Sequence, residues 1–412
     1  MLLLMAILDA FNDEISYIQR QALNTPVTFF SEARMMEALT LMRNALPGAS
    51  EIYYALKSCY HPPLLESIAG QNLGAEVLSD LEFDLAKAHG FTKFIVNGMG
   101  REKSFFEKVL VEKDVCIIVD SAQDIESLQS MAPTLSRPIS LGFRFIIDLP
   151  SGSSYYQQDD HKLGNYFDSD LFRKFIDLCK QDHFVWNLMH THITINELDE
   201  TVYLEALSIL RSYLESLNSQ GISLPNYIDI GGGFEVFDPR KAAVFTKLFT
   251  QITATFNADF PEQKLIVEPG RYLSAYAGYT LGTVRDIKKL KNKYWIITDI
   301  GTNILIPIPN ARYTLLKPVA TKQGISAGIT DGITSPSNNI ITDVQLSALP
   351  QIGDYICIGN TGAYTDVYST FWAYAPHQVV FKTSDGVFQP YRTEEDIQKL
   401  RHIFFKSSKE QN

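Results

Sequence analysis

Strand-like and helix-like stretches alternate along the chain from about Ser31 to Arg271. Eight short apolar runs between turn residues are typical of buried strands, at residues 51–57, 74–79, 91–98, 114–121, 137–145, 184–194, 226–233 and 264–271. Amphipathic stretches predict the helices between them, at residues 62–72, 81–89, 101–112, 122–131, 169–180, 197–219 and 239–257. An eighth helix, at residues 31–45 with Ser31 as its N-cap, precedes the first strand.

This alternation predicts the fold of the first two thirds of the chain. Strands that alternate with helices of this length form parallel βαβ units. Eight such units predict a closed (β/α)8 barrel of the TIM type. The alternative is an open doubly wound sheet. We prefer the barrel because the count comes to eight and no dinucleotide-binding glycine fingerprint follows an early strand.

The chain changes character after Arg271. Four β-type runs are separated by Gly, Asn and Pro turns, at residues 294–297, 313–316, 354–358 and 378–382. Helical patterns are nearly absent until the last residues, which predicts a mostly antiparallel C-terminal β domain. The expected division is a barrel at residues 29–271, a β domain at 272–412 and an N-terminal segment at 1–28 that packs with the β domain. Residues 1–8 are apolar but lack a basic leader and are too short to cross a membrane.

Composition excludes several classes of protein. Hydrophobic residues make up 45% and charged residues 20%, as in soluble globular proteins. The net charge of −11 argues against a nucleic-acid-binding surface. Four cysteines without paired spacing (Cys59, Cys116, Cys179 and Cys357) favour a reducing, cytoplasmic location over a disulfide framework or a zinc site.

Lys57 ends the apolar run Tyr53-Tyr54-Ala55-Leu56. Partial burial lowers the pKa of a lysine and frees its amine for Schiff-base chemistry, although a lysine at a strand end also snorkels to solvent without any function. Since the first and last strands of a barrel are neighbours, Lys57 is expected beside the loop Glu268-Pro269-Gly270-Arg271.

A glycine triplet follows the seventh strand, at Gly231, Gly232 and Gly233. Such a loop lets backbone N–H groups approach an anion, and barrels often bind phosphate with the loops after strands seven and eight. A lysine, a phosphate cradle and a carboxylate are what pyridoxal 5′-phosphate requires. Glu268 is the candidate partner of the pyridine nitrogen.

Four further residues are candidates at the same end of the barrel. His190 and His192 end the sixth strand and face one side by alternation. No carboxylate or cysteine lies close to them in sequence, so we expect no metal site there. We interpret His192 as packing on the cofactor ring and His190 as a core residue. Arg144 and Glu76, inside apolar strands, are either cofactor-site or purely structural charges.

At this point the residues resemble the pyridoxal-phosphate decarboxylases of the ornithine, diaminopimelate and arginine type, whose barrel is shared with alanine racemase. The motifs that carry the resemblance run in order: Tyr54-Ala55-Leu56-Lys57, Gly74-Ala75-Glu76-Val77-Leu78-Ser79, Val119-Asp120-Ser121, His161-Lys162-Leu163-Gly164, His190-Thr191-His192, Asp229-Ile230-Gly231-Gly232-Gly233-Phe234, Glu268-Pro269-Gly270-Arg271 and Gly362-Ala363-Tyr364. The resemblance implies that Tyr364 reaches the phosphate. It also implies a head-to-tail homodimer with shared active sites.

The chain departs from the family pattern where substrate is chosen. Ser335 stands in place of the usual cysteine, and Pro336 and Asn339 replace acidic residues. Ile306 replaces the arginine with which diaminopimelate-specific members hold the distal carboxylate, and Thr194-Ile195 replaces a small Gly-Ser pair. In this the chain resembles decarboxylases of siderophore and other specialised pathways, which act on larger amino-acid conjugates.

The expected function is therefore a pyridoxal-phosphate-dependent decarboxylase of an amino acid or amino-acid conjugate, with Lys57, His192 and Ser335 as catalytic candidates. Ser335 is a poor acid, so water, Lys57 or another side chain are alternative proton donors. Two alternatives stay open. One is an amino-acid racemase on the same scaffold, and the other is a noncatalytic, partner-binding paralogue.

Overall fold

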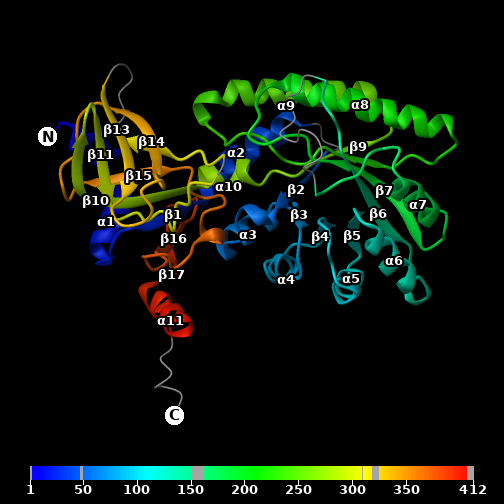
Figure 1. Ribbon diagram of the computed structural model, residues 1–412, viewed down its shortest axis with the longest axis horizontal. Coiled ribbons are helices and arrows are strands. Elements are labelled where there is room, and N and C mark those ends of the chain that lie inside the picture. Colours follow the sequence, from blue (N-terminus) through cyan, green and yellow to red (C-terminus); the bar gives the residue numbers. More distant parts are fainter. Residues whose placement is uncertain (1, 47–49, 151–161, 309, 318–323, 406–412) are drawn as a thin grey trace, which may run out of the picture. The chain divides into compact units, whose positions relative to one another are not determined.

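The computed structural model describes residues 2–46, 50–150, 162–308, 310–317 and 324–405, without side chains before residue 11. His161 of the predicted His161–Gly164 motif lies outside these residues. Two compact units are present, one spanning Ala38–Tyr272 and the other combining Met1–Glu37 with Leu273–Asn412 (Figure 1). Each unit is described by itself.

The first unit is a closed barrel of eight parallel strands, which confirms the predicted fold. The strands follow one another around the barrel in chain order: β2 (Glu51–Ala55), β3 (Gly74–Val77), β4 (Lys93–Val96), β5 (Asp114–Val119), β6 (Ile139–Phe145), β7 (Phe184–Thr191), β8 (Tyr227–Asp229) and β9 (Lys264–Val267). The barrel closes through β2 and β9, where Glu51 pairs with Ile266 and Ile52 with Val267.

Several strands end earlier than the sequence predicted. β2 ends at Ala55, β8 at Asp229 and β9 at Val267, so Lys57, the glycine triplet and Arg271 all lie beyond the strands. The strand-like pattern continues past each strand because these loops stay largely buried at the end of the barrel, although Lys57, Gly233 and Arg271 are partly exposed. The chemistry-bearing residues therefore belong to loops and short helices that the strands position.

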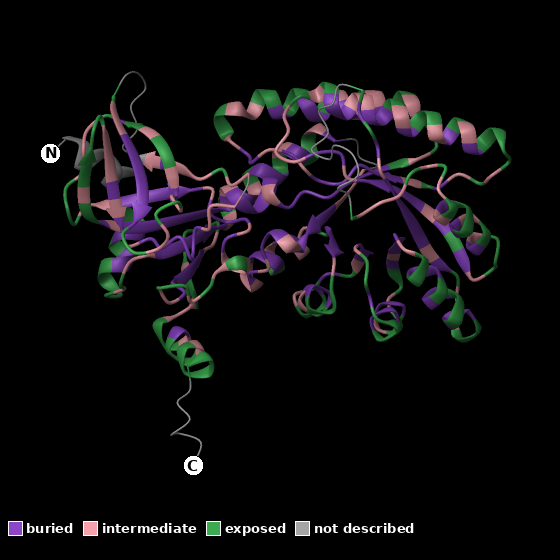
Figure 2. Cartoon of the chain, in the orientation of Figure 1, coloured by how far each residue is buried: buried purple, intermediate pink, exposed green. Residues whose placement is uncertain are grey.

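Helices cover the barrel strands, which are largely buried, and expose their own outer faces (Figure 2). They are α2 (Glu32–Ala45), α3 (Pro62–Ala69), α4 (Asp80–Ala88), α5 (Lys103–Val109), α6 (Ala122–Met131), α7 (Asp170–Cys179), α8 (Glu200–Ser219) and α9 (Ala242–Asp259). Serine side chains accept from the first-turn backbone of three of them, at Ser79, Ser121 and Ser169. These caps satisfy backbone donors that the helix itself leaves unpaired, so they mark where each helix begins.

The second unit contains a sheet of nine strands among its described residues. The strands are β1 (Val27–Ser31), β10 (Gly278–Leu290), β11 (Lys293–Thr298), β12 (Thr314–Lys317), β13 (Ile325–Asp331), β14 (Ile341–Leu346), β15 (Tyr355–Gly359), β16 (Gln378–Lys382) and β17 (Phe388–Arg392). Six of the eight strand pairings are antiparallel and two, β1 with β16 and β11 with β13, are parallel. The expectation of a mostly antiparallel β domain is confirmed.

The N-terminal region contributes a strand to this sheet. β1 lies between β10 and β16 in register, with Phe29 opposite Tyr279 on one side and Val380 on the other. The domain boundary expected after residue 28 cuts through this strand. The strand is defined by pairing with residues far away in the chain, and no pattern in the neighbouring sequence indicates that pairing. Helices α1 (Leu2–Arg20), α10 (Arg271–Ala277) and α11 (Glu394–Phe404) complete the chain.

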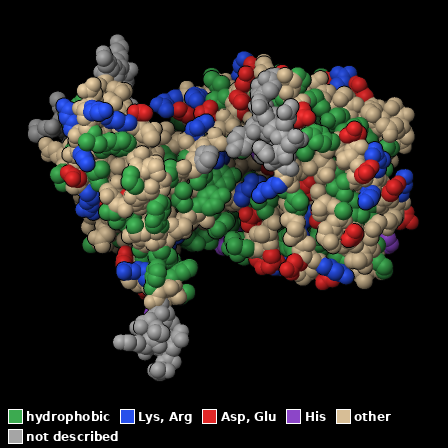
Figure 3. All heavy atoms as spheres, in the orientation of Figure 1, with side chains coloured by type: hydrophobic (Ala, Val, Ile, Leu, Met, Phe, Trp, Pro, Cys, Tyr) green, Lys and Arg blue, Asp and Glu red, His purple; other side chains and the backbone are tan. Residues whose placement is uncertain are grey.

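Three general properties bear on the class of protein. Among the described residues no helix combines the length and apolarity needed to span a membrane. All four cysteines are free thiols. Acidic and basic side chains are interspersed over the face shown in Figure 3.

Candidate active site

Lys57 lies in a short 3-10 helix, Leu56–Ser58, immediately after β2. The turn between β9 and α10 packs against this helix, since a Cβ added to Gly270 would lie 3.1 Å from the Cβ of Ala55 and 3.0 Å from that of Ser58. Gly270 thus serves close packing. The arrangement brings Lys57 beside the loop that carries Glu268, as the barrel closure predicted.

The Lys57 amine forms an ion pair with Glu76 of β3. Nζ lies 2.7 Å from Oε2, and the lysine side chain is 33% exposed whereas that of Glu76 is fully buried. Burial raises the pKa of Glu76 to about 7, although the neighbouring Lys57 opposes the shift and the Glu268 carboxylate adds to it. A carboxyl group that titrates near neutrality beside an amine can accept the proton that the amine must lose before it reacts.

Glu268 lies beyond β9 and faces His190 of β7, with Oε2 3.5 Å from the imidazole Nε2. Asp229, the last residue of β8, adds a second carboxylate. One imidazole nitrogen of His190 and one carboxyl oxygen each of Asp229 and Glu268 all lie within 4.8 Å of one another. All three side chains are buried. These carboxylates lie far from the histidines in sequence, and the barrel brings them together because adjacent strand ends meet at one end of it. His190 is therefore a site residue rather than only a core one.

His192 follows β7 and packs against the glycine loop. A Cβ on Gly231 would lie 2.7 Å from Nδ1 of His192, so only glycine allows this contact. Burial lowers the pKa of His192 to about 3, and the positive charges of Arg144 and Lys57 act in the same direction. The imidazole is consequently neutral at pH 7, which suits a ring that packs on another ring.

Packing alone requires glycine at all three positions of the triplet. Gly231 and Gly233 have positive φ angles of 70° and 82°, which L side chains rarely adopt. A Cβ on Gly232 would lie 2.4 Å from the carbonyl oxygen of Glu268. The backbone N–H of Gly231 donates to Asp229 Oδ1 at 2.8 Å, whereas those of Gly232 and Gly233 have no acceptor in the described part of the chain. These two donors are suited to an anion.

Asn97, beyond β4, links Arg144 to His190. Its Oδ1 accepts from Arg144 Nη1 at 3.4 Å, and its Nδ2 lies 3.3 Å from His190 Nε2. The sequence analysis missed Asn97, although its place at the end of a predicted strand was a usable signal. Nearby, the carboxylate of Asp120 accepts from Gly164 N at 2.7 Å and Asn165 Nδ2 at 3.0 Å. Asp120 thus holds the Lys162–Gly164 part of the predicted motif against the barrel.

Three further predicted residues lie on other elements. Arg271 begins α10 rather than ending a strand. Tyr364 and Ser335 belong to the second unit. There Tyr364 adopts a φ of 56°, and Ser335 Oγ lies 2.9 Å from Ser337 Oγ. Their roles remain predictions from the resemblance.

The barrel residues fit pyridoxal phosphate. Buried polar atoms of three side chains have no hydrogen-bond partner among the residues that the structure describes, namely Glu76 Oε1, His190 Nδ1 and Glu268 Oε1. Such atoms are costly to leave unpaired in a folded protein, so they indicate a polar ligand. The partly exposed lysine suits the aldehyde of pyridoxal phosphate, and the two free backbone donors suit its phosphate. The buried unpaired atoms suit the polar groups of the ring, including its nitrogen.

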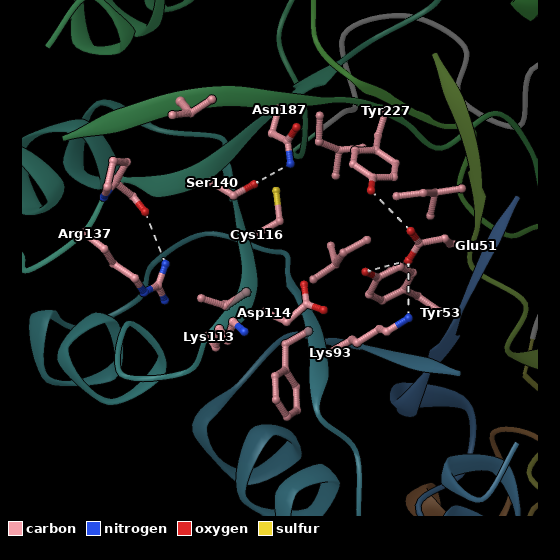
Figure 4. A pocket seen from close by; sticks show the side chains of 17 residues that line it. Glu51, Tyr53, Lys93, Lys113, Asp114, Cys116, Arg137, Ser140, Asn187 and Tyr227 are labelled. Atoms are coloured by element: carbon pink, nitrogen blue, oxygen red, sulfur yellow. Dashed lines mark hydrogen bonds and ion pairs between the residues drawn. The ribbon is translucent and has the colours of Figure 1, made fainter. Parts of the chain in front are cut away.

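A separate cavity of about 310 Å³ opens at the opposite end of the barrel (Figure 4). Its polar groups are paired with one another: Tyr227 and Tyr53 direct their hydroxyls at Glu51 at 3.3 and 3.5 Å. Asn187 donates to Ser140 at 3.0 Å. Since Glu51 begins β2 and Lys57 follows its end, this cavity is remote from the catalytic group.

Comparison with known proteins identifies the family. Residues 32–275 match the sequence profile described as pyridoxal-dependent decarboxylase, pyridoxal binding domain. The chain belongs to this family. It is a pyridoxal-phosphate-dependent carboxy-lyase of amino acids, as the sequence predicted.

Two curated relatives show how far the similarity extends. The diaminopimelate decarboxylase of Aquifex aeolicus is 26% identical over 390 residues, covering 91% of this chain and 90% of that protein. A diaminopimelate decarboxylase of Helicobacter pylori strain J99 is 22% identical, covering 92% and 95%.

Solved structures share the fold. Diaminopimelate decarboxylase from M. jannaschii, solved with L-lysine, superposes with a TM-score of 0.79 at 20% identity, covering 93% of each chain. Lysine/ornithine decarboxylase from Vibrio vulnificus, solved with putrescine, gives 0.73 at 17% identity, covering 90% of this chain and 97% of the other.

Proposed function

We propose that this enzyme decarboxylates an amino acid, or an amino-acid conjugate, whose distal end is neutral and rich in hydrogen-bonding groups. The observation that carries the catalytic half is the ion pair between Lys57 and Glu76 beside the buried Glu268. The assignment of the substrate rests on the residues that replace the charged recognition groups of the family.

When bound, pyridoxal phosphate supplies a protonated ring that accepts the electrons left by the departing carboxylate. Lys57 is the residue that would hold its aldehyde, and Glu76 would accept the proton that the amine gives up. Glu268, whose Oε1 has no partner in the described part of the chain, would keep the ring nitrogen protonated. The N–H groups of Gly232 and Gly233, with Arg271 and Tyr364, would hold the phosphate. His192 would pack on the ring.

The loop that carries Ser335 is held by Asp331. This carboxylate accepts from the backbone N–H groups of Thr302 at 2.7 Å, Ile333 at 3.0 Å and Thr334 at 2.8 Å. A loop held by three such bonds presents its side chains in a defined way, so its residue types decide what it can do. Ser335 offers a hydroxyl in place of a thiol, which supports water or Lys57 as the proton donor to the product.

The relatives are named diaminopimelate decarboxylases, but this chain has Ile306 where a distal carboxylate would need an arginine. Burying an unpaired polar group costs about 2–7 kcal/mol, and burying an unpaired charge costs more. A distal carboxylate without a cation would therefore bind poorly here. Pro336 and Asn339 likewise offer no charge to a distal ammonium. We therefore expect amides or citryl-type conjugates, such as occur in siderophore or other specialised pathways.

A substrate panel tests this proposal. The holoenzyme is incubated with diaminopimelate, lysine, ornithine and arginine, and with amide and citryl conjugates of the same amines, while released CO₂ and amine are measured. Rapid turnover of a free diamino acid would refute the substrate assignment while leaving the decarboxylase in place. An enantiomer without CO₂ would instead identify a racemase.

We also propose a head-to-tail homodimer with shared sites in a reducing, cytoplasmic compartment, which four free thiols support. Mixing inactive Lys57→Ala protein with inactive Ser335→Trp protein should restore partial activity, because a mixed dimer has one intact site. Persistent inactivity, despite subunit exchange shown by mass spectrometry, would argue for independent sites.

A further inference from the structure

Asp229 is a buried carboxyl group for which the proposed mechanism has no role. It ends β8 with no solvent exposure. Its Oδ1 accepts from the backbone N–H of Gly231 at 2.8 Å, while Oδ2 has no donor among the described residues. The side chain is thus attached to the glycine loop by one oxygen and presents the other to its surroundings.

The neighbouring carboxyl group is that of Glu268. A carboxyl oxygen of Asp229 and one of Glu268 lie within 4.8 Å of each other. The backbone keeps them together, since Glu268 N donates to the carbonyl of Gly231 at 2.8 Å. Glu268 Oε1 also lacks a donor. Two ionised carboxylates this close in a buried site would repel, and Asp229 Oδ2 and Glu268 Oε1 would both stay without a donor.

The surroundings decide which of the two carries the proton. Glu268 faces His190 of β7 and the Lys57 amine, which both favour its ionised form, against the effect of burial. Asp229 faces the carboxyls of Glu268 and Glu76, and on the β5 side the Cys116 thiol. Burial and the charge of Glu268 raise the pKa of Asp229 well above its usual range, although the Gly231 N–H opposes this.

We propose that Asp229 is a neutral carboxylic acid whose O–H donates to Glu268, so that it holds the Glu268 carboxylate in place and joins it to the glycine loop. Asp229 is a positioning residue in this scheme, since it acts through Glu268 and Gly231. One shared proton removes the repulsion and satisfies Asp229 Oδ2, while the remaining lone pairs of the Glu268 carboxylate stay available to the cofactor ring nitrogen. The inference rests on the proposed function only in the use of Glu268 toward the cofactor ring.

The isosteric variant Asp229→Asn tests the neutral state directly. Its amide can accept from Gly231 N–H and donate to Glu268, as a protonated aspartic acid does. We expect the dissociation constant for pyridoxal phosphate, measured by absorbance titration of the full-length apo-protein, to stay within about 3-fold of the parent for this variant. Asp229→Ala should weaken binding roughly 10–100-fold, because it removes two buried hydrogen bonds. Equal weakening by both substitutions would overturn the proposal.

Infrared spectroscopy detects the protonation state of the Asp229 carboxyl group and requires neither catalytic activity nor bound cofactor. The difference spectrum of parent minus Asp229→Asn at pH 7 should contain the C=O stretching band of a protonated carboxylic acid. Asp199→Asn is the matched control, since the Asp199 carboxylate caps α8 at the surface and accepts from Thr201 N at 3.0 Å. It should remove a carboxylate band only.

A carboxylate band in the Asp229 difference spectrum would overturn the proposal even if Asp229→Ala fails to fold. The band is independent of catalysis. An enzyme that shows the acid band but releases no CO₂ would disprove the proposed function and leave the protonation state standing.

Discussion

The Nζ atom of Lys57 lies 2.7 Å from Oε2 of Glu76 at the end of the barrel. Glu76 belongs to β3, and Lys57 follows the neighbouring strand β2. Backbone pairing of Ala55 with Glu76 puts the lysine, two residues further on, directly over the carboxylate. The pair joins a partly exposed amine to a fully buried acid. An amine that must alternate between charged and uncharged forms needs such a neighbour.

Lys57→Ala should abolish turnover and the visible absorbance of the cofactor-bound protein while the chain stays folded. The lysine is 33% exposed, so its loss leaves little unfilled core. Absorbance spectra and thermal melts measure the two effects. Lys87→Ala, which removes a surface lysine paired with Glu112, is the control and should change neither. Unaltered turnover in Lys57→Ala would disprove the assignment.

Glu76 should make the stability of the apo-protein fall between pH 4.5 and about 7. Its pKa is raised from 4.5 to about 7, so in this window the folded state binds more protons than the unfolded state. Stability from this group is complete below pH 4.5 and is lost as pH rises through about 7, with a slope of at most about 1.4 kcal/mol per pH unit. Urea unfolding across this range, compared with Glu76→Gln, isolates the slope. A difference between the two proteins that is constant with pH would contradict the shift.

Glu268→Gln should lower turnover more than cofactor affinity. An amide cannot carry the full negative charge that a protonated ring nitrogen requires, so we expect roughly a 10²–10³-fold fall in kcat, the scale for removing one preorganised electrostatic group. Kd for the cofactor should change far less, since the lysine and the loop still hold it. Steady-state kinetics and cofactor titration give the two numbers, and a parental kcat would mean that the ring nitrogen has another partner.

Gly232→Ala should weaken both cofactor binding and the fold. The added Cβ would lie 2.4 Å from the Glu268 carbonyl oxygen, so the loop must move. Overpacking of this kind costs about 1–3 kcal/mol. Gly221→Ala, where a Cβ meets open space, should leave cofactor affinity unchanged. Melting temperature and cofactor Kd are the measurements.

Much of the barrel and several site residues were predictable from local pattern. The eight strands and their order follow from apolar runs separated by helical stretches, and β2 with β9 must meet once a barrel closes. Strand ends were predicted too far along, because residues such as Leu56 and Gly231 are buried loop residues that resemble strand continuations. The strand β1 was missed because its partners β10 and β16 lie about 250 and 350 residues away in the chain.

The sequence by itself determined the type of cofactor site, because a lysine after the first strand, three glycines after the seventh and an acidic residue after the eighth have fixed places in a closed barrel. Only the tertiary structure decided the electrostatics. Glu76, Asp229, His190 and Glu268 come from four different strands or strand ends and meet in a buried space where their charges depend on one another. Proton positions in such a group follow from distances of a few ångströms across the barrel, and the linear order of residues contains no record of those distances.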